Sequence, residues 1–167
     1  SSVHVTFPQP ISLGGAKLNA LDTWGLYFPK TGQIITSPNT DEFGLASITK
    51  LYTALIALGA LDRPEVIAVP TKLPEVEPLL SLTPGSTISF GDAMLASLIP
   101  SANDAAVTLG TVGFDSWKGF TQTLGFTATI LTEPSGLDQK NKSTTKETLL
   151  LGAIALQNLR IKEAVSQ

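Results

Sequence analysis

The stretch LYTALIALGAL, residues 51–61, is apolar almost all round when it is wound as a helix. We predict a helix that begins near Ser47 and runs to about Leu58, with Gly59 near its end. A helix without a polar face must be enclosed by other elements, so it should lie in the centre of the fold. The run is too short to span a bilayer, and a chain of 167 residues is long enough for one domain with a real core.

Lys50 is the one charged residue between Glu42 and Asp62, and it stands at the start of this apolar helix. Ser47 lies three residues earlier, where the two side chains share a helix face with about 5–6 Å between their Cβ atoms. The lysine can take the serine proton near neutral pH only if its pKa falls from about 10.4, and burial is the usual cause of such a fall. The simpler alternative is that Ser47 only caps the helix.

A second Ser-x-x-Lys stretch, STTK at residues 143–146, has different surroundings. Lys146 has Glu147 beside it and two further lysines close before it. Thr144 and Glu147 have the spacing of a capping box. We therefore interpret this stretch as a helix start with a solvated lysine, and we expect at most one of the two stretches to be catalytic.

A second polar pair, Ser101 and Asn103 in SANDAA, follows a helix that Pro100 terminates. A hydroxyl and a carboxamide here could face a substrate from the opposite wall of a cleft. The carboxamide could bind a substrate carbonyl or hold the lysine, and the hydroxyl could relay a proton to a leaving amine. The alternative is a capping box made by Ser101 and Asp104.

The residue inventory excludes several other chemistries. The chain has no cysteine, so thiolate metal sites and cysteine nucleophiles are excluded. Its one histidine, His4, lies near an end, so we expect neither a Ser-His-Asp triad nor a histidine metal site. The net charge of −3 without a basic cluster argues against nucleic acid as a partner.

The remaining segments predict a helix-dominated α+β fold. A hairpin is expected from residues 21–28 and 33–37, with the turn PKTG between them. Short strands are expected at 65–69 and 86–90, and residues 127–143 should be mostly loop.

Further helices are expected in the second half of the chain. They are 91–99, one starting near 103, 114–125, and 144–167 with a break near Asn158.

Three stretches together resemble the low-molecular-mass penicillin-binding proteins of the D-alanyl-D-alanine carboxypeptidase type. They are ASITKLYTALIAL, GSTISFGDAMLASLIPSANDAAVTLG and GLDQKNKSTTKETLLLGAIAL. The resemblance runs in order from about Trp24 to the C-terminus and implies a β-lactamase/transpeptidase-like fold. By this similarity Ser47 is the acylated nucleophile, Lys50 is its base, and Ser101 and Asn103 form the second motif. The Ser47 N–H would be one arm of the oxyanion hole.

The same resemblance implies a function and a location. The family acts on peptidoglycan stem peptides outside the cytoplasm, needs no cofactor and is acylated by β-lactams. A signal peptide would therefore already have been removed from this chain. A β-lactamase is a weaker alternative, because the Glu-x-x-Leu-Asn pattern of that relative matches neither Glu133 nor Glu147.

The family's third motif, Lys-Thr-Gly on a later strand, does not follow Asn103 in this chain. The triplet at residues 30–32 precedes Ser47, and we predict that it forms the hairpin turn. We therefore expect residues 1–167 to be a single incomplete domain that holds only the N-terminal hairpin of the sheet. A fragment is the favoured explanation. The alternatives are a second chain that completes the sheet, or a reduced homologue that binds peptidoglycan or serves as a scaffold without catalysis.

Overall fold

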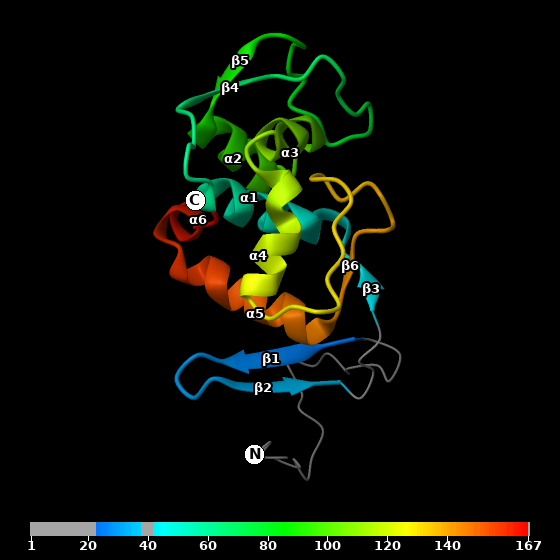
Figure 1. The fold of residues 1–167 in the computed structure, drawn as a ribbon, viewed down its shortest axis with the longest axis vertical. Coiled ribbons are helices and arrows are strands. Elements are labelled where there is room, and N and C mark those ends of the chain that lie inside the picture. Colours follow the sequence, from blue (N-terminus) through cyan, green and yellow to red (C-terminus); the bar gives the residue numbers. More distant parts are fainter. Residues whose placement is uncertain (1–22, 38–41, 167) are drawn as a thin grey trace.

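The apolar helix lies at the centre of the molecule, as predicted. The computed structural model describes residues 23–37 and 42–166, so His4 and the irregular lead-in expected for residues 1–20 lie outside the described residues. Helix α1 (Thr49–Gly59) is buried on nearly every side, and a short 3₁₀ turn, η1 (Ala46–Ile48), precedes it. Figure 1 shows α1 with other helices on several sides.

The surrounding helices enclose α1 from several directions. They are α2 (Phe90–Leu98), α3 (Asn103–Gly110), α4 (Trp117–Thr123), α5 (Thr145–Gln157) and α6 (Leu159–Ala164). The pair α2 and α3 packs on α1, and α5 packs on it separately. A 3₁₀ turn, η2 (Phe114–Ser116), leads into α4. The core contains Tyr52 and Leu55 of α1 together with apolar side chains of all these helices except α4, whose apolar residues pack against the core.

Local capping explains where two of the predicted helix boundaries fall. The Ser89 hydroxyl accepts the Asp92 N–H at 3.0 Å, which starts α2. The side-chain oxygen of Asn158 accepts the N–H groups of Arg160 and Ile161, so the last helical region is divided there into α5 and α6. The break predicted near Asn158 is therefore confirmed.

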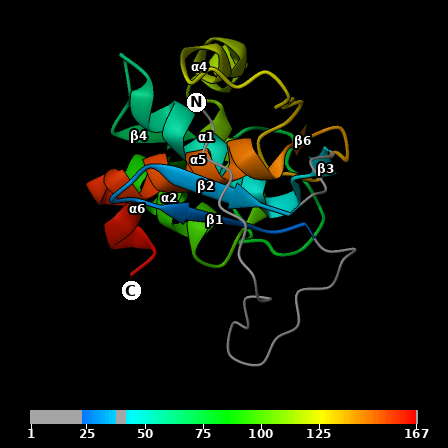
Figure 2. The same ribbon diagram turned by 90° about the horizontal axis from the view of Figure 1, so that it is seen from below.

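The N-terminal hairpin covers the outer face of α5. Strands β1 (Gly25–Phe28) and β2 (Gln33–Thr36) pair antiparallel, and Figure 2 shows them crossing over α5. The close packing depends on Gly25, because a Cβ there would overlap Leu149 and lie 3.0 Å from Thr145. Helix α5 is thus sandwiched between the hairpin and α1.

The triplet at residues 30–32 forms the hairpin turn, as predicted. Gly32 has a φ of +69° and donates its N–H to the Phe28 carbonyl at 2.8 Å. The triplet thus serves the turn that joins β1 to β2.

Two further short pairings occur among the described residues. Strands β4 (Val66–Ala68) and β5 (Thr87–Ser89) pair antiparallel, which confirms the two short strands predicted there. Strand β3 (Phe43–Gly44) pairs with β6 (Lys142–Ser143), which the sequence analysis missed because it treated 127–143 as mostly loop. The α+β, helix-dominated prediction is confirmed, and the expectation of a single incomplete domain stays a prediction.

In the described part of the chain, no helix combines the length and apolar character needed to cross a membrane.

Candidate active site

Lys50 connects three separate parts of the chain. Its side chain is only 2% exposed, and its Nζ donates to Ser47 Oγ at 3.0 Å. The other two hydrogen bonds go to Asn103 Oδ1 and to the Ser135 carbonyl, both at 2.8 Å. The structure therefore brings Ser47, Lys50 and Asn103 together, and it adds Ser135, which the sequence analysis did not single out.

The chemistry of these three partners decides what a neutral Lys50 would do. The amide oxygen of Asn103 and the carbonyl of Ser135 can only accept hydrogen bonds, whereas the Ser47 hydroxyl can also donate one. A neutral amine has two N–H groups and a lone pair. It can keep both acceptor-only partners and direct its lone pair at the Ser47 hydroxyl, as a base for that proton requires.

The surroundings of Lys50 favour that neutral form. Burial lowers the pKa of Lys50, because an ammonium group loses hydration inside the protein. The negative charge of Glu133 partly opposes this effect and raises the pKa. The net direction is downward, as a lysine base near neutral pH needs.

Ser47 does not cap the apolar helix, so that alternative is wrong. The residue at the N-cap of α1 is Ile48, and no side chain caps the helix. Ser47 lies one residue earlier, inside η1, and is exposed to solvent. Its neighbour Ala46 has a φ of +44°, which is strained for a residue with a Cβ. The turn thus presents the hydroxyl outward while Lys50 stays buried behind it.

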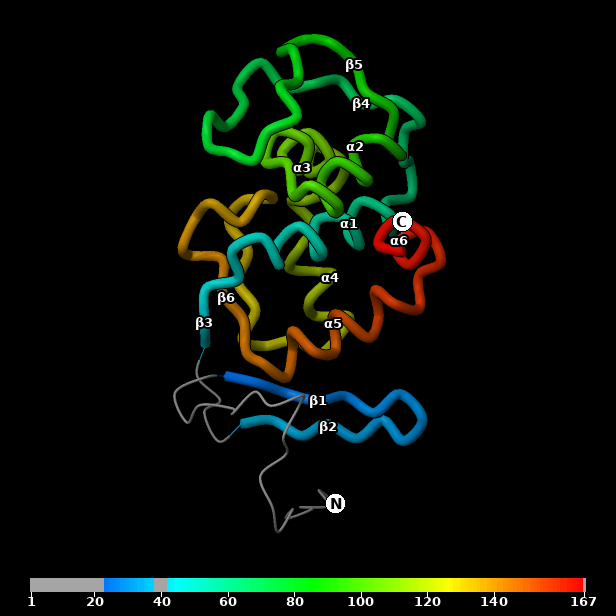
Figure 3. The backbone as a smooth tube through the Cα atoms, turned by 180° about the vertical axis from the view of Figure 1, so that it is seen from behind, coloured from blue at the N-terminus to red at the C-terminus, as the bar shows by residue number. Residues whose placement is uncertain are grey.

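A glycine of a distant loop lies against this turn. A Cβ on Gly136 would overlap the carbonyl oxygen of Ala46 and lie 3.1 Å from the Ser47 amide nitrogen. Gly136 also has a φ of +89°, which glycine tolerates best. Figure 3 shows this yellow-to-orange loop, ahead of β6, beside the start of α1.

Asn103 is held in one orientation by two bonds. While its Oδ1 accepts from Lys50, its Nδ2 donates to the Val76 carbonyl at 2.7 Å. Its side chain is 3% exposed, so neither bond is readily exchanged for water. Of the two roles considered for this carboxamide, the described contacts match the one that holds the lysine.

Ser101 occupies a strained position at the start of α3. Its φ is +60°, and its hydroxyl makes no hydrogen bond to any described residue. The alternative of a Ser101–Asp104 capping box is wrong, because the N-cap is Ala102 and the Asp104 carboxylate accepts the N–H groups of Leu80 and Leu82 instead. The unbonded hydroxyl of Ser101 remains available to another group.

The second Ser-x-x-Lys stretch is a helix start, as predicted. Thr144 caps α5 by accepting the Glu147 N–H at 3.3 Å, and Lys146 is exposed. The hydroxyl of Ser143 is buried and lies 2.8 Å from Thr129 Oγ1 and 3.4 Å from the Tyr52 hydroxyl. The serine and lysine of this stretch are therefore not paired.

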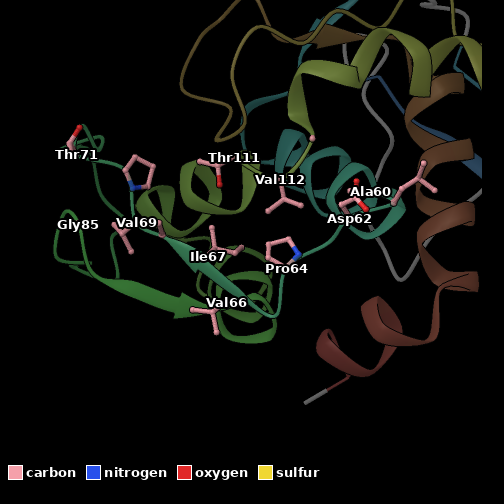
Figure 4. Close-up of a pocket in the computed structure, with 14 residues that line it drawn as sticks. Ala60, Asp62, Pro64, Val66, Ile67, Val69, Thr71, Gly85, Thr111 and Val112 are labelled. Carbon is pink, nitrogen blue, oxygen red and sulfur yellow. The ribbon is translucent and has the colours of Figure 1, made fainter.

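The wide cavity in Figure 4 does not coincide with the cluster of Ser47, Lys50 and Asn103. It holds about 930 Å³ between the end of α1, strand β4 and the end of α3. Its lining includes Pro64, Val66, Ile67 and Val112, but none of the four predicted site residues. Across residues 23–37 and 42–166, no cluster of three or more His, Cys, Asp or Glu side chains could hold a metal ion.

The loop residues behind Lys50 are the part of the site that sequence reasoning missed. The PSG stretch indicates a turn at residues 134–136, but it carries no sign that the Ser135 carbonyl faces a lysine 85 residues away. Glu133 was considered only as a possible β-lactamase glutamate. Asn141 bonds both Thr49 and the Glu133 carbonyl, and it was not singled out at all.

Family models and solved structures both relate this chain to D-alanyl-D-alanine carboxypeptidases. The model of the D-alanyl-D-alanine carboxypeptidase family, peptidase S11, matches residues 22–165. A search of curated proteins finds no match.

Solved structures of similar fold agree with this match. A D-alanyl-D-alanine carboxypeptidase from Mycobacterium tuberculosis is 26% identical with a TM-score of 0.78, over 87% of this chain and 59% of that one. Penicillin-binding protein D2 from Listeria monocytogenes, bound to cefotaxime, is 27% identical with a TM-score of 0.67, over 83% of this chain and 62% of that one.

A more distant structure shares the fold alone. The DD-transpeptidase of Streptomyces K15 is 16% identical with a TM-score of 0.71, over 87% of this chain and 63% of that one. The chain thus spans about three-fifths of the length of the solved proteins that it matches.

Proposed function

This chain belongs to the D-alanyl-D-alanine carboxypeptidase family, and we propose that it carries the acylation centre of a serine acyl-transfer enzyme. The observation that carries the proposal is the 3.0 Å contact between an exposed Ser47 hydroxyl and a buried Lys50 amine. The two other bonds of that amine go to groups that can only accept.

The first chemical step uses this contact. Ser47 Oγ attacks the carbonyl carbon of a terminal D-alanyl-D-alanine peptide bond, while its proton passes to Lys50 Nζ. The C–O bond of a tetrahedral intermediate forms, and the C–N bond then breaks. The amine of D-alanine leaves with a proton, and the acyl group stays on Ser47 until water or another amine takes it.

Two further groups would serve this step. The N–H of Ser47 lies in the opening turn of η1, where helix N–H groups lack intrahelical acceptors, so it is available to an oxyanion. The Ser101 hydroxyl has no partner among the described residues, so it is free to relay a proton to the leaving amine. Asn103 holds the amine of Lys50 by accepting its hydrogen bond at 2.8 Å.

The proposed substrate is a peptidoglycan stem peptide, and β-lactams would act as its analogues. This extends to the chain what the matching family's description and the cefotaxime-bound relative support. Such a substrate lies outside the cytoplasm, so we propose a periplasmic or cell-wall location for the protein.

Among the described residues, the proposed cleft lacks the wall that a Lys-Thr-Gly strand forms in the family. In the family a Lys-Thr-Gly strand binds the substrate carboxylate, whereas the triplet of this chain forms the hairpin turn. We propose that a strand from a C-terminal segment or a second chain completes the sheet beside the β1–β2 hairpin. Acylation by the 167-residue chain alone should then be slow.

Release of D-alanine tests the reaction. The chain is incubated with a peptide ending in D-alanyl-D-alanine, and free D-alanine is measured over time. Release that is lost in Ser47→Ala and kept in Lys146→Ala supports the proposal, because Lys146 is the exposed lysine of the second Ser-x-x-Lys stretch. Binding of the peptide without any release, unchanged by Ser47→Ala, would instead favour a non-catalytic binding domain of the same fold.

A further inference from the structure

The carboxylate of Glu133 organises the loop behind Lys50. Its Oε2 accepts the Ser135 N–H at 2.8 Å and the Ser135 hydroxyl at 2.5 Å. Its Oε1 accepts the N–H groups of Gly136 at 2.5 Å and Asp138 at 3.2 Å. Asn141 Nδ2 adds a fifth bond at 3.2 Å. One carboxylate therefore binds donors from four residues of the loop, Ser135, Gly136, Asp138 and Asn141.

The two residues that this carboxylate holds most closely are the ones that meet the acylation centre. The carbonyl of Ser135 accepts a hydrogen bond from Lys50 Nζ. Gly136 lies against the peptide between Ala46 and Ser47. The carboxylate of Glu133 thus fixes the position of the Ser135 carbonyl, which accepts from Lys50. It also fixes the position of Gly136, which packs against the turn that carries Ser47.

We propose that Glu133 is a positioning residue, which sets the location of Lys50 and Ser47 by holding the turn formed by Ser135 and Gly136. This inference rests on the proposed function and names a residue that acts through others. Glu133 has no hydrogen bond to Ser47 or Lys50 in the described structure, so its effect passes through backbone atoms and through its charge.

The negative charge of Glu133 should shift the pKa of Lys50 in a direction that can be measured. The elements around Lys50 also carry Asp104 on α3, Glu77 in the preceding segment, and Asp138 in the same loop. Glu133 is the charged group in the described part of the chain that acts on the pKa of Lys50, and it raises that pKa. Removing its charge while keeping its size should therefore lower the pKa of Lys50 further.

The test is a titration of Lys50 by NMR in the 167-residue chain with ¹⁵N- and ¹³C-labelled lysine. We expect Glu133→Gln to shift the Lys50 titration to lower pH, and Glu133→Asp to lie nearer to the unmodified chain. Asp138→Asn is the matched control, because it removes one charge from the same loop and should leave the Lys50 titration in place. A folded Glu133→Gln variant whose Lys50 titration is unmoved or moves to higher pH overturns the proposal.

A second measurement covers a Glu133→Gln variant that does not fold. Glu133→Asp keeps the charge but is one methylene too short to keep all five bonds, so the Ser135 carbonyl should withdraw from Lys50. The Lys50 ¹⁵Nζ chemical shift should then change, and an unchanged shift in folded Glu133→Asp contradicts the proposal.

The acylation rate separates this inference from the proposed function. Where the unmodified chain is acylated by a penicillin, Glu133→Gln should be acylated about tenfold to a hundredfold more slowly, as expected for a misplacement near 1 Å. Failure of acylation in the unmodified chain counts against the proposed function alone, because the Lys50 titration needs no substrate.

Discussion

The side-chain oxygen of Asn103 and the amine nitrogen of Lys50 lie 2.8 Å apart, although 53 positions separate the two residues in the chain. The same carboxamide donates to the Val76 carbonyl at 2.7 Å, so it joins the first turn of α1, the start of α3 and the segment before α2. Both bonds are buried or nearly so. The proposed acylation centre therefore also links three segments of the fold.

Replacing Asn103 should weaken the whole fold. Asn103→Leu keeps the size of the side chain but leaves a Lys50 N–H and the Val76 carbonyl without partners. Each unpaired buried group costs about 1–3 kcal/mol, so the free energy of unfolding should fall by at least the cost of one such group. Urea unfolding measures it. Gln139→Leu, at an exposed loop amide, is the control and should change stability by only about 0.5 kcal/mol; equal effects of the two variants would contradict the structural role.

Gly136→Ala should disrupt the turn that carries Ser47. The new methyl group would overlap the Ala46 carbonyl, and the residue would adopt a left-handed conformation that costs about 1–2 kcal/mol by itself. We expect a lower free energy of unfolding and loss of penicillin acylation. Gly152→Ala is the matched control, because nothing lies within 4 Å of its Cβ position and alanine favours α5 by about 1 kcal/mol. A Gly136→Ala variant as stable and reactive as Gly152→Ala would show that the close approach is absent in solution.

The burial of Lys50 predicts how stability changes with pH. The pKa of Lys50 is lowered in the folded state, so the unfolded chain binds more protons between that lowered value and 10.5. Stability rises with pH wherever the unfolded state binds more protons. The Lys50→Met variant lacks this contribution. The free energy of unfolding of the unmodified chain, relative to Lys50→Met, should therefore increase as pH rises toward 10.5, the reference pKa of the lysine in the unfolded chain.

Urea unfolding at a series of alkaline pH values measures that difference. Lys146→Met, in the second Ser-x-x-Lys stretch, provides the comparison for loss of an exposed lysine. Identical pH dependence in Lys50→Met and Lys146→Met would mean that Lys50 is not buried as the structure places it.

Glu147 predicts a separate effect in acid. Burial raises the pKa of Glu147, but hydrogen bonds from the Thr129 hydroxyl and from the N–H groups of Ala128 and Thr127 lower it, and the net direction is downward. A carboxyl with a lowered folded pKa stabilises the fold above its unfolded value near 4.5 and loses that contribution as pH falls through the folded value.

Glu147→Gln should therefore destabilise the chain at pH 7 by about 1–3 kcal/mol, and the difference should shrink in acid. Unfolding free energies measured from pH 7 down to pH 3 check this. The control is Glu163→Gln on α6, where the carboxylate is exposed. A Glu147→Gln deficit that stays constant across this pH range would contradict the hydrogen-bonded carboxylate.

The elements that the sequence predicted correctly have local signals. Ser89 and Asn158 set helix boundaries through bonds to N–H groups two or three residues away, so a short window contains the whole signal. The apolar run of α1 likewise requires burial whatever surrounds it. The pairing of β3 with β6 has no such local signal, because each strand is two residues long and its partner lies about 100 residues away.

The same distinction applies to the site. The Ser47–Lys50 contact follows from helical spacing, and the link to Asn103 was one of two roles expected for that carboxamide. The positive φ of Ser101 and the Ser135 carbonyl on Lys50 are set by tertiary packing and could not be predicted from the residues around them. The Ser-x-x-Asp spacing of residues 101–104 was also compatible with a capping box, but Asp104 instead accepts the N–H groups of Leu80 and Leu82.

The site of a β-lactam adduct shows whether Ser47 is the nucleophile. The 167-residue chain is incubated at length with a labelled penicillin, and intact mass and peptide mapping locate the label. We expect a slow covalent adduct on Ser47 that is lost in Ser47→Ala and in Lys50→Met and kept in Lys146→Met. No adduct after prolonged incubation, or one on any other residue, would contradict the assignment of Ser47 as the nucleophile and Lys50 as its base.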